Sequence, residues 1–338
     1  MGAAGSKAAI ERTRIGTSFL IIISLRVTHS KCPLVSKKFK SPFKNLRLDS
    51  RIPTDKFVPV SFSTTTMALL QSLVSGPLLL GDLPEASSFP YQKLSLPGEF
   101  TLLNLQQKLG HLYEDALAIL IDHSPRWELL ARNLQIQSDI HTTLGELDFL
   151  LRDLNTDQLV HLELATKFYL AVETGSELLL PGPDARDNYA RKLSLLRSHQ
   201  LKLPEKHPLH LPKKYRDEPI VTNHLIYGCL FDHINAPSPT FPEFLNPDCR
   251  RGKWLTISEI SSFFSAGTNF ELIPKYLWPV PFQFLTNHAL SPWKPETTVE
   301  RCLMVRPDNS HHPFFITPDS YPESLKIKET HMAVTMRV

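Results

Sequence analysis

Three carboxylates and one ammonium group recur at even spacing in the middle of this 338-residue sequence. Glu146 and Asp148 lie two residues apart, and Glu163 and Lys167 follow in the next apolar segment. In an extended strand, residues at even spacing point to the same side. If the two segments form a hairpin, all four groups therefore face one region of the protein.

Acids held this close raise one another's pKa unless a cation lies between them. Carboxylate oxygens suit Mg²⁺ or Mn²⁺ better than zinc, because hard cations prefer oxygen ligands. Such an ion polarises a phosphodiester and lowers the pKa of attacking water, while a nearby lysine stabilises the developing charge. Two interpretations follow. Glu146, Asp148 and Glu163 are metal ligands, or the segment is an acidic hairpin in which Lys167 pairs with an acid on a solvated face.

The flanking residues predict the two strands and the turn that such a site requires. Leu144–Leu151 and Leu159–Tyr169 alternate in character, and Asn155 and Asp157 between them supply turn chemistry. On the second segment the face opposite Glu163 is apolar, which favours packing under a helix. We therefore expect a hairpin whose polar face carries the acids.

The neighbouring elements are predicted from hydrophobic periodicity. Leucine spacing predicts a long helix over Glu99–His123, while Trp127–Gln137 and Ile220–Phe231 are typical of strands. Asp184 is a candidate N-cap for a helix that ends near His199. Helices and strands that follow one another in this way indicate an α/β fold.

The segments GELDFLL and VHLELATK resemble the GE-x-D, strand, E-x-K signature of the PD-(D/E)XK nuclease superfamily. LGHLYEDALAIL is similar to the first helix of that superfamily, in which Glu114 matches a metal-supporting glutamate. The resemblance implies a mixed central sheet flanked by helices, built as helix, three strands, helix and strand. It also implies Mg²⁺ or Mn²⁺ held by Asp148, Glu163, Glu146 and Glu114, with Lys167, Glu163 and Asp148 as catalytic residues.

One position departs from the superfamily signature. The usual lysine lies two residues after Glu163, where this chain has Ala165, and Lys167 lies two residues farther on. Two residues of a flat strand advance about 7 Å and four advance about 13 Å. Lys192, on the helix that follows, is a candidate substitute. The departure keeps a second hypothesis open, in which a catalytically inactive nuclease-like core serves as a binding or scaffold module.

The span from about residue 70 to residue 322 also resembles a family catalogued as domain of unknown function 1853. The similar segments are LGHLYEDAL, HSPRWELLARNLQI, LGELDFLLRD, HLELATKFYL and GPDARDNYARKLSLLRSHQL, with weaker similarity at RRGKWL and FFITPDSYP. The fifth segment contains Arg186, Lys192 and Gln200, which are candidate substrate-binding residues. Charged helix residues are also common on solvated faces, which is the competing interpretation.

Charge divides the chain near residue 66. Residues 1–66 hold 12 basic and 3 acidic residues, whereas the remainder has a net charge of −6. We predict a basic, unfolded extension over 1–66, a nuclease-like domain over 67–322 with its core at about 100–232, and a polar tail over 323–338. Prolines concentrate beyond Leu180, which predicts a proline-rich C-terminal elaboration. The acidic balance of the domain argues against tight nonspecific binding to duplex DNA.

Short sequence motifs limit the possible cellular location of the protein and its possible cofactors. The apolar run IGTSFLIIISL is too short to span a membrane, and its basic surroundings fit an organellar presequence better than a secretory signal. Alternatively, translation begins at Met67. The four cysteines form no CxxC pair, which favours a reducing compartment, cytoplasmic or mitochondrial. No GxxxxGK[ST] or GxGxxG motif is present, so no nucleotide cofactor is expected.

The sequence therefore predicts a PD-(D/E)XK-like α/β protein that hydrolyses phosphodiesters of nucleic acid with Mg²⁺ or Mn²⁺. The alternative is the inactive nuclease-like binding module. Oligomeric state, substrate structure and the choice between DNA and RNA are not determined by these patterns.

Overall fold

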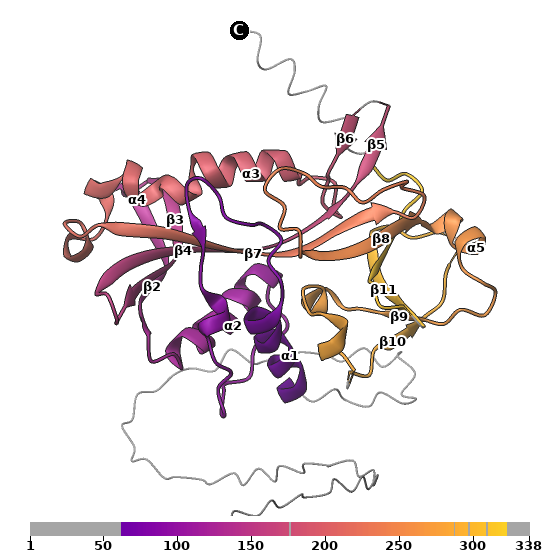
Figure 1. The fold of residues 1–338 in the computed structure, drawn as a ribbon, viewed down its shortest axis with the longest axis horizontal. Helices are drawn as coiled ribbons and strands as arrows, with labels where there is room; N and C mark the ends of the chain where they lie inside the picture. The colour runs from indigo at the N-terminus through magenta and orange to yellow at the C-terminus, as the bar shows by residue number, and fades with distance from the viewer. Residues whose placement is uncertain (1–61, 176, 287, 297, 309, 323–338) are drawn as a thin grey trace, which may run out of the picture. The chain divides into compact units, whose positions relative to one another are not determined.

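The computed structural model describes residues 62–175, 177–286, 288–296, 298–308 and 310–322 (Figure 1). The extension up to residue 61 and the tail from residue 323 lie outside the described residues. The predictions of an unfolded extension, a presequence and a polar tail fall there. The first helix, α1, begins at Phe62, five residues before the predicted domain boundary at Met67.

One mixed sheet of ten strands organises the fold, in the order β10, β9, β11, β12, β8, β7, β4, β3, β2, with β1 paired to β7 beside this path. Its strands are β1 (Ser87–Ser88), β2 (Trp127–Asp139), β3 (Thr142–Asp153), β4 (Gln158–Leu170), β7 (Ile220–His233), β8 (Arg250–Thr256), β9 (Phe270–Leu272), β10 (Ser291–Trp293), β11 (Leu303–Pro307) and β12 (Phe314–Thr317). A separate hairpin holds β5 (Val172–Thr174) and β6 (Glu177–Leu179).

Strand directions divide the sheet into three regions. The strands β2, β3 and β4 form an antiparallel meander, and β12, β11, β9 and β10 form a second antiparallel region. Between them β4, β7, β8 and β12 run parallel. The predicted mixed central sheet flanked by helices is therefore confirmed.

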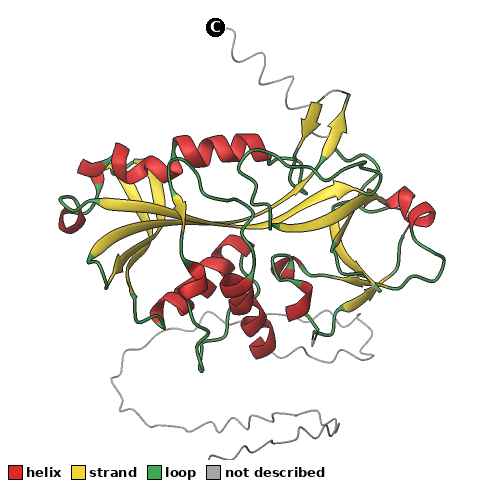
Figure 2. Ribbon diagram, in the orientation of Figure 1, coloured by secondary structure: helices red, strands yellow, loops and turns green. Residues whose placement is uncertain are grey.

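Helices cover both faces of the sheet (Figures 1 and 2). On one face lie α1 (Phe62–Ser75) and α2 (Leu109–Asp122), and on the other lie α3 (Tyr189–Ser198) and α4 (Leu203–Lys206). A short helix, α5 (Ile260–Phe263), follows β8. The 3₁₀ turns are η1 (Tyr91–Lys93), η2 (Gln200–Lys202), η3 (Pro208–His210), η4 (Lys213–Tyr215), η5 (Ile257–Glu259), η6 (Lys275–Leu277) and η7 (Phe282–Phe284).

Alternation along β4 explains why both faces are covered. Leu162, Leu164 and Phe168 belong to the core cluster formed with α1 and α2, as the apolar face of this segment predicted. Ala165 and Tyr169 project to the opposite side and pack in the cluster that includes α3. Because both faces of β4 are buried, a one-residue shift of its register would exchange the side chains on the two faces and place Glu163 in the apolar core beside α1 and α2.

Two predicted helix boundaries are wrong. The helix expected from Glu99 begins only at Leu109, because the Asn104 side chain accepts a hydrogen bond from the Gln106 N–H and turns the chain. Leu102, assigned to the apolar stripe of that helix, is 54% exposed. The N-cap of α3 is Asn188 rather than Asp184, since the Asn188 side chain accepts from the Arg191 N–H.

The segment 202–219, which is rich in proline and basic residues, is folded against the sheet. It contains α4 and two 3₁₀ turns, and its Leu203, Leu211 and Tyr215 are buried. Cys229, Cys249 and Cys302 are free, buried thiols. None of the helices in the described residues combines the length and the apolar character needed to cross a bilayer.

Candidate functional site

The site forms where β3 and β4 separate. The two strands pair from Phe149 opposite Leu162 to Asp153 opposite Gln158, near the hairpin turn. The rest of β4 continues beside β7. Where β3 has diverged, the backbone N–H of Leu164 donates to Asp148 Oδ2 at 2.9 Å. The separation therefore leaves room for a carboxylate between two strands that would otherwise hydrogen-bond to each other.

Glu163 occupies the neighbouring position on β4 and is almost completely buried. The residue is 3% exposed, and the Gln200 Nε2 donates to Glu163 Oε1 at 2.5 Å. The second oxygen, Oε2, is buried without a hydrogen-bond partner. An unpartnered buried carboxylate oxygen is costly, so this atom requires a cation, a proton or a water.

The electrostatics of the two acids agree with that requirement. Burial raises the pKa of Asp148 to about 7, with further contributions from Glu114 and Glu146. Burial also raises the pKa of Glu163 well above its ordinary value, and the Asp148 carboxylate adds to this effect. The Lys167 ammonium opposes it. The pair therefore carries less than two negative charges at neutral pH unless a cation compensates.

Glu114 approaches Asp148 from α2. Its Oε2 accepts a hydrogen bond from Asn133 Nδ2 at 3.0 Å and lies 3.4 Å from His111 Nδ1. Glu114 thus contacts a neighbouring histidine and also lies beside the acids of the sheet.

Asn133 was not identified from the sequence. It lies in β2 between the partners of Phe149 and Leu147, which places it opposite Asp148, and its φ is +51°. Asparagine tolerates this left-handed conformation better than most residues. The sequence offers no signal for it, because a strand pattern does not show which residue leaves the ladder.

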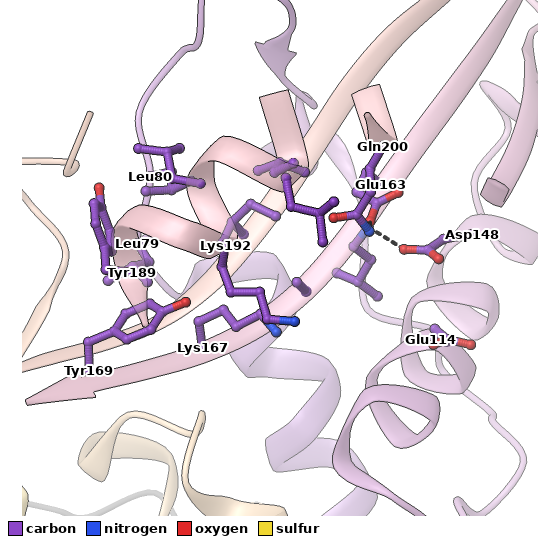
Figure 3. Close-up of a pocket in the computed structure, with 16 residues that line it drawn as sticks. Leu79, Leu80, Glu114, Asp148, Glu163, Lys167, Tyr169, Tyr189, Lys192 and Gln200 are labelled. Atoms are coloured by element: carbon purple, nitrogen blue, oxygen red, sulfur yellow. Dashed lines mark hydrogen bonds between the residues drawn. The ribbon is translucent and has the colours of Figure 1, made fainter. Parts of the chain in front are cut away.

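Two lysines face the acids across a cavity of about 250 Å³. The charged and polar residues that line it are Glu114, Asp148, Glu163, Lys167, Lys192 and Gln200 (Figure 3). Lys167 Nζ lies 3.7 Å from Asp187 Oδ2, so part of its charge is already balanced. Lys192 forms no ion pair with another described residue.

Most of the predicted site residues converge on this cavity, and two do not line it. Glu146 acts on the pKa of Asp148 and Glu163 through its charge but lies outside the cavity wall. Arg186 lies outside as well, exposed and paired with Asp184 at 2.9 Å. Lys192 and Gln200 do line the cavity.

His161 is a second residue that sequence patterns did not identify as functional. It is fully buried, neither ring nitrogen has a hydrogen-bond partner, and its Nε2 lies 3.8 Å from Glu163 Oε2. Burial lowers the pKa of His161 to about 3, so the ring is neutral at physiological pH. The alternating pattern had placed it on the polar face of β4, which is where it lies.

The side-chain oxygen atoms at the site are of the kind that binds a divalent cation. Asp148 and Glu163 supply oxygens, and Glu163 Oε2 is an orphaned buried atom that a cation would satisfy. As the side chains stand, no group of three or more His, Cys, Asp or Glu residues in the described part of the chain is close enough to enclose an ion. A bound ion would therefore take part of its ligands from water or substrate, as Mg²⁺ commonly does.

Comparison with known proteins identifies one family. A family model described as "Domain of unknown function (DUF1853)" matches residues 83–330, which include every residue of the cavity wall except Leu79 and Leu80. No curated protein and no solved structure matches the chain.

Proposed function

Since this chain belongs to the family described as domain of unknown function (DUF1853), a description that names no activity, we propose its function from the site itself. The protein is a metal-dependent phosphodiester hydrolase that acts on nucleic acid. One observation carries the proposal: the carboxylates of the partly buried Asp148 and the buried Glu163 meet at the separation of β3 and β4, and one oxygen of Glu163 has no hydrogen-bond partner.

Asp148 and Glu163 would hold the ion, with Glu114 behind Asp148. Mg²⁺ or Mn²⁺ would supply Lewis acidity and lower the pKa of attacking water. Gln200 fixes the orientation of Glu163 through its hydrogen bond. Lys167 and Lys192 supply positive charge at the same cavity, where the negative charge of a phosphoryl group would develop.

The order of elements supports the PD-(D/E)XK interpretation. Reading along the chain, α2, β2, β3, β4, α3 and β7 give helix, three strands, helix and strand, with β4 and β7 parallel. The hairpin of β5 and β6 is inserted before α3, and α4 with its 3₁₀ turns is inserted after it. The acids lie on the second and third of these strands, as the superfamily signature requires. Ala165 at the usual lysine position remains a departure, and Lys167 and Lys192 are the two available substitutes.

Nucleic acid is the proposed substrate because the segment that contains α3, a helix that lines the cavity, is basic. Residues 186–216, which include α3 and α4, contain nine Lys or Arg and two Asp or Glu. This contrasts with the net −6 of the chain beyond residue 66. A local basic segment beside an acidic cavity suits a polyanion whose phosphate reaches the acids.

Cleavage assays with single-stranded, duplex and branched DNA and RNA test the proposal. The full chain should cut at least one of these substrates when Mg²⁺ or Mn²⁺ is added and none after chelation. Glu163→Gln should abolish cleavage, whereas Glu128→Gln, which removes an exposed carboxylate of β2, should leave it unchanged. Metal-independent cleavage, or cleavage that survives Glu163→Gln, contradicts the proposal.

A catalytically inactive binding module is the second candidate. The ion pair between Lys167 and Asp187, together with Ala165, favours it, because the lysine charge is shared with a residue outside the acidic pair. Calorimetry with Mn²⁺ on the wild type and on Asp148→Ala separates the two candidates. Heat of Mn²⁺ binding that Asp148→Ala removes supports the hydrolase, and no heat in either protein supports the inactive module.

A further inference from the structure

Glu163 has a histidine neighbour, His161, and both side chains contain buried polar atoms without hydrogen-bond partners. His161 lies two residues earlier on the same face of β4, and both residues are buried. Neither ring nitrogen of His161 nor Oε2 of Glu163 has a hydrogen-bond partner. Three unsatisfied polar atoms in one small region are more than a folded core usually retains, and this calls for a ligand.

The distance between the two groups suits a shared ligand better than a direct hydrogen bond. His161 Nε2 and Glu163 Oε2 are 3.8 Å apart, beyond the range of an N–H···O hydrogen bond. Two atoms at this separation can both lie about 2.1 Å from one metal ion, which is the usual length of a bond from a metal to an imidazole nitrogen or a carboxylate oxygen. The separation of the two atoms on β4 is therefore compatible with one ion shared between them.

We propose that His161 Nε2 is a metal ligand alongside Glu163, and that the resulting nitrogen and oxygen donor set makes the site selective for Mn²⁺ over Mg²⁺. The inference rests on the proposed function, because it concerns the ion that Glu163 holds. Imidazole suits transition metals, whereas Mg²⁺ prefers oxygen ligands throughout. The oxygen-only donor set expected from the sequence is thereby extended by one nitrogen.

His224 provides a matched control. It is also fully buried with both ring nitrogens unpartnered, and it lies directly beside Glu163 in the register of β4 and β7. The Asp82 carboxylate raises the pKa of His224, whereas burial lowers it by a larger amount. His224 is therefore as buried as His161 and lies in the same region. Unlike His161, it has no ring nitrogen within 4 Å of the Glu163 carboxylate among the ion pairs of the described residues.

Pulsed electron paramagnetic resonance on the metal-free full chain loaded with Mn²⁺ tests the proposal, because it detects the nitrogen of a directly coordinated imidazole. The wild type should show this nitrogen coupling. It should disappear in His161→Gln and persist in His224→Gln. Competition titrations should show the preference for Mn²⁺ over Mg²⁺ falling about tenfold in His161→Gln and staying unchanged in His224→Gln.

The outcomes separate this inference from the proposed function. Bound Mn²⁺ without nitrogen coupling in the wild type overturns the role of His161 and leaves the hydrolase proposal intact, and this result needs no variant to fold. Coupling that survives His161→Gln also overturns it. Failure of the wild type to bind Mn²⁺ at all overturns both. Circular dichroism of each variant ensures that a lost signal reflects a lost ligand.

Discussion

The ionisation of Asp148 links the candidate site to the stability of the protein. Burial raises its pKa from 3.8 to about 7. Between these values the native protein retains a proton that the unfolded chain releases, so rising pH favours unfolding. The stabilising effect of this proton is complete below about pH 4 and is lost as the pH rises through about 7.

We therefore expect the metal-free protein to lose stability between about pH 4 and pH 7, and Asp148→Asn to flatten this part of the profile. Urea unfolding at several pH values measures the effect. Glu128→Gln serves as the control, because this carboxylate is exposed. An unchanged slope in Asp148→Asn would show that the carboxyl group is not the one that titrates.

The two lysines of the cavity should differ in their contributions. The charge of Lys167 is one of the main influences on the pKa of Glu163, and that of Lys192 is not. Under the proposed function, Lys167→Ala should lower kcat about a hundredfold, the usual effect of removing one group that stabilises transition-state charge. Lys192→Ala should mainly raise KM, because its charge lies at the same cavity without contacting the acids.

Steady-state kinetics on both variants checks this difference, with Lys93→Ala as an exposed control far from the cavity wall. The opposite pattern, in which Lys192→Ala lowers kcat and Lys167→Ala does not, would assign the superfamily lysine to α3.

Among the secondary-structure elements, β7 can approach β4 closely only because it has a glycine at position 228. Gly228 has φ +151°, and a Cβ placed there would lie 1.7 Å from the carbonyl oxygen of Lys167 on β4. Gly228→Ala must therefore push the two strands apart. We expect it to lower the free energy of unfolding by about 3 kcal/mol or more. Gly98→Ala is the control, since nothing lies within 4 Å of the added atom. Thermal unfolding of both variants measures the difference, and equal melting temperatures would contradict the close approach of β4 and β7.

The sequence predicted β3 and β4 well, because the residue pattern that defines each strand lies within the strand itself. Apolar and acidic residues alternate on either side of the turn at Asn155 and Asp157, and β3 and β4 form there as expected. Sequence alone could not show where these strands separate, and it is this separation that places Asp148 against the Leu164 N–H. Asn133 and His161 were missed for the same reason, since their roles come from contacts across strands.

The errors at the helix starts have an equally local cause. Apolar spacing before Leu109 satisfies a helical pattern, but a side chain that bonds to its own turn competes with the helix, as Asn104 does. Asp184 is a suitable N-cap by residue type, yet its carboxylate bonds to the Arg186 N–H in a turn instead. Residue type and apolar spacing therefore could not choose between a helix start and a local turn at either place.

At the scale of the whole molecule, the folded core begins earlier in the chain than the span that the family model matches. The match begins at residue 83, whereas Leu69, Leu70 and Leu73 of α1 are fully buried in the main core. Burial of each such side chain contributes about 1.5–3 kcal/mol, so removal of α1 should cost a large part of the total stability.

We expect a shortened chain that begins at Leu83 to be insoluble or to lack cooperative unfolding, and one that begins at Lys56 to behave as the full chain does. Calorimetric melting of both proteins provides the measurement. A stable protein from Leu83 onward would mean that α1 is dispensable for the core.

The parallel middle of the sheet has a consequence for the speed of folding. Leu159 pairs with Ile220, and Lys253 pairs with Phe314, so each of these parallel strand pairs brings together segments about 60 residues apart in the sequence. In contrast, the strands of the meander β2, β3 and β4 follow one another directly in the chain. Distant pairings are slow to form because a long loop must close first. During refolding from denaturant we therefore expect the acid-bearing hairpin to form early, and the arrival of β7 to set the overall rate.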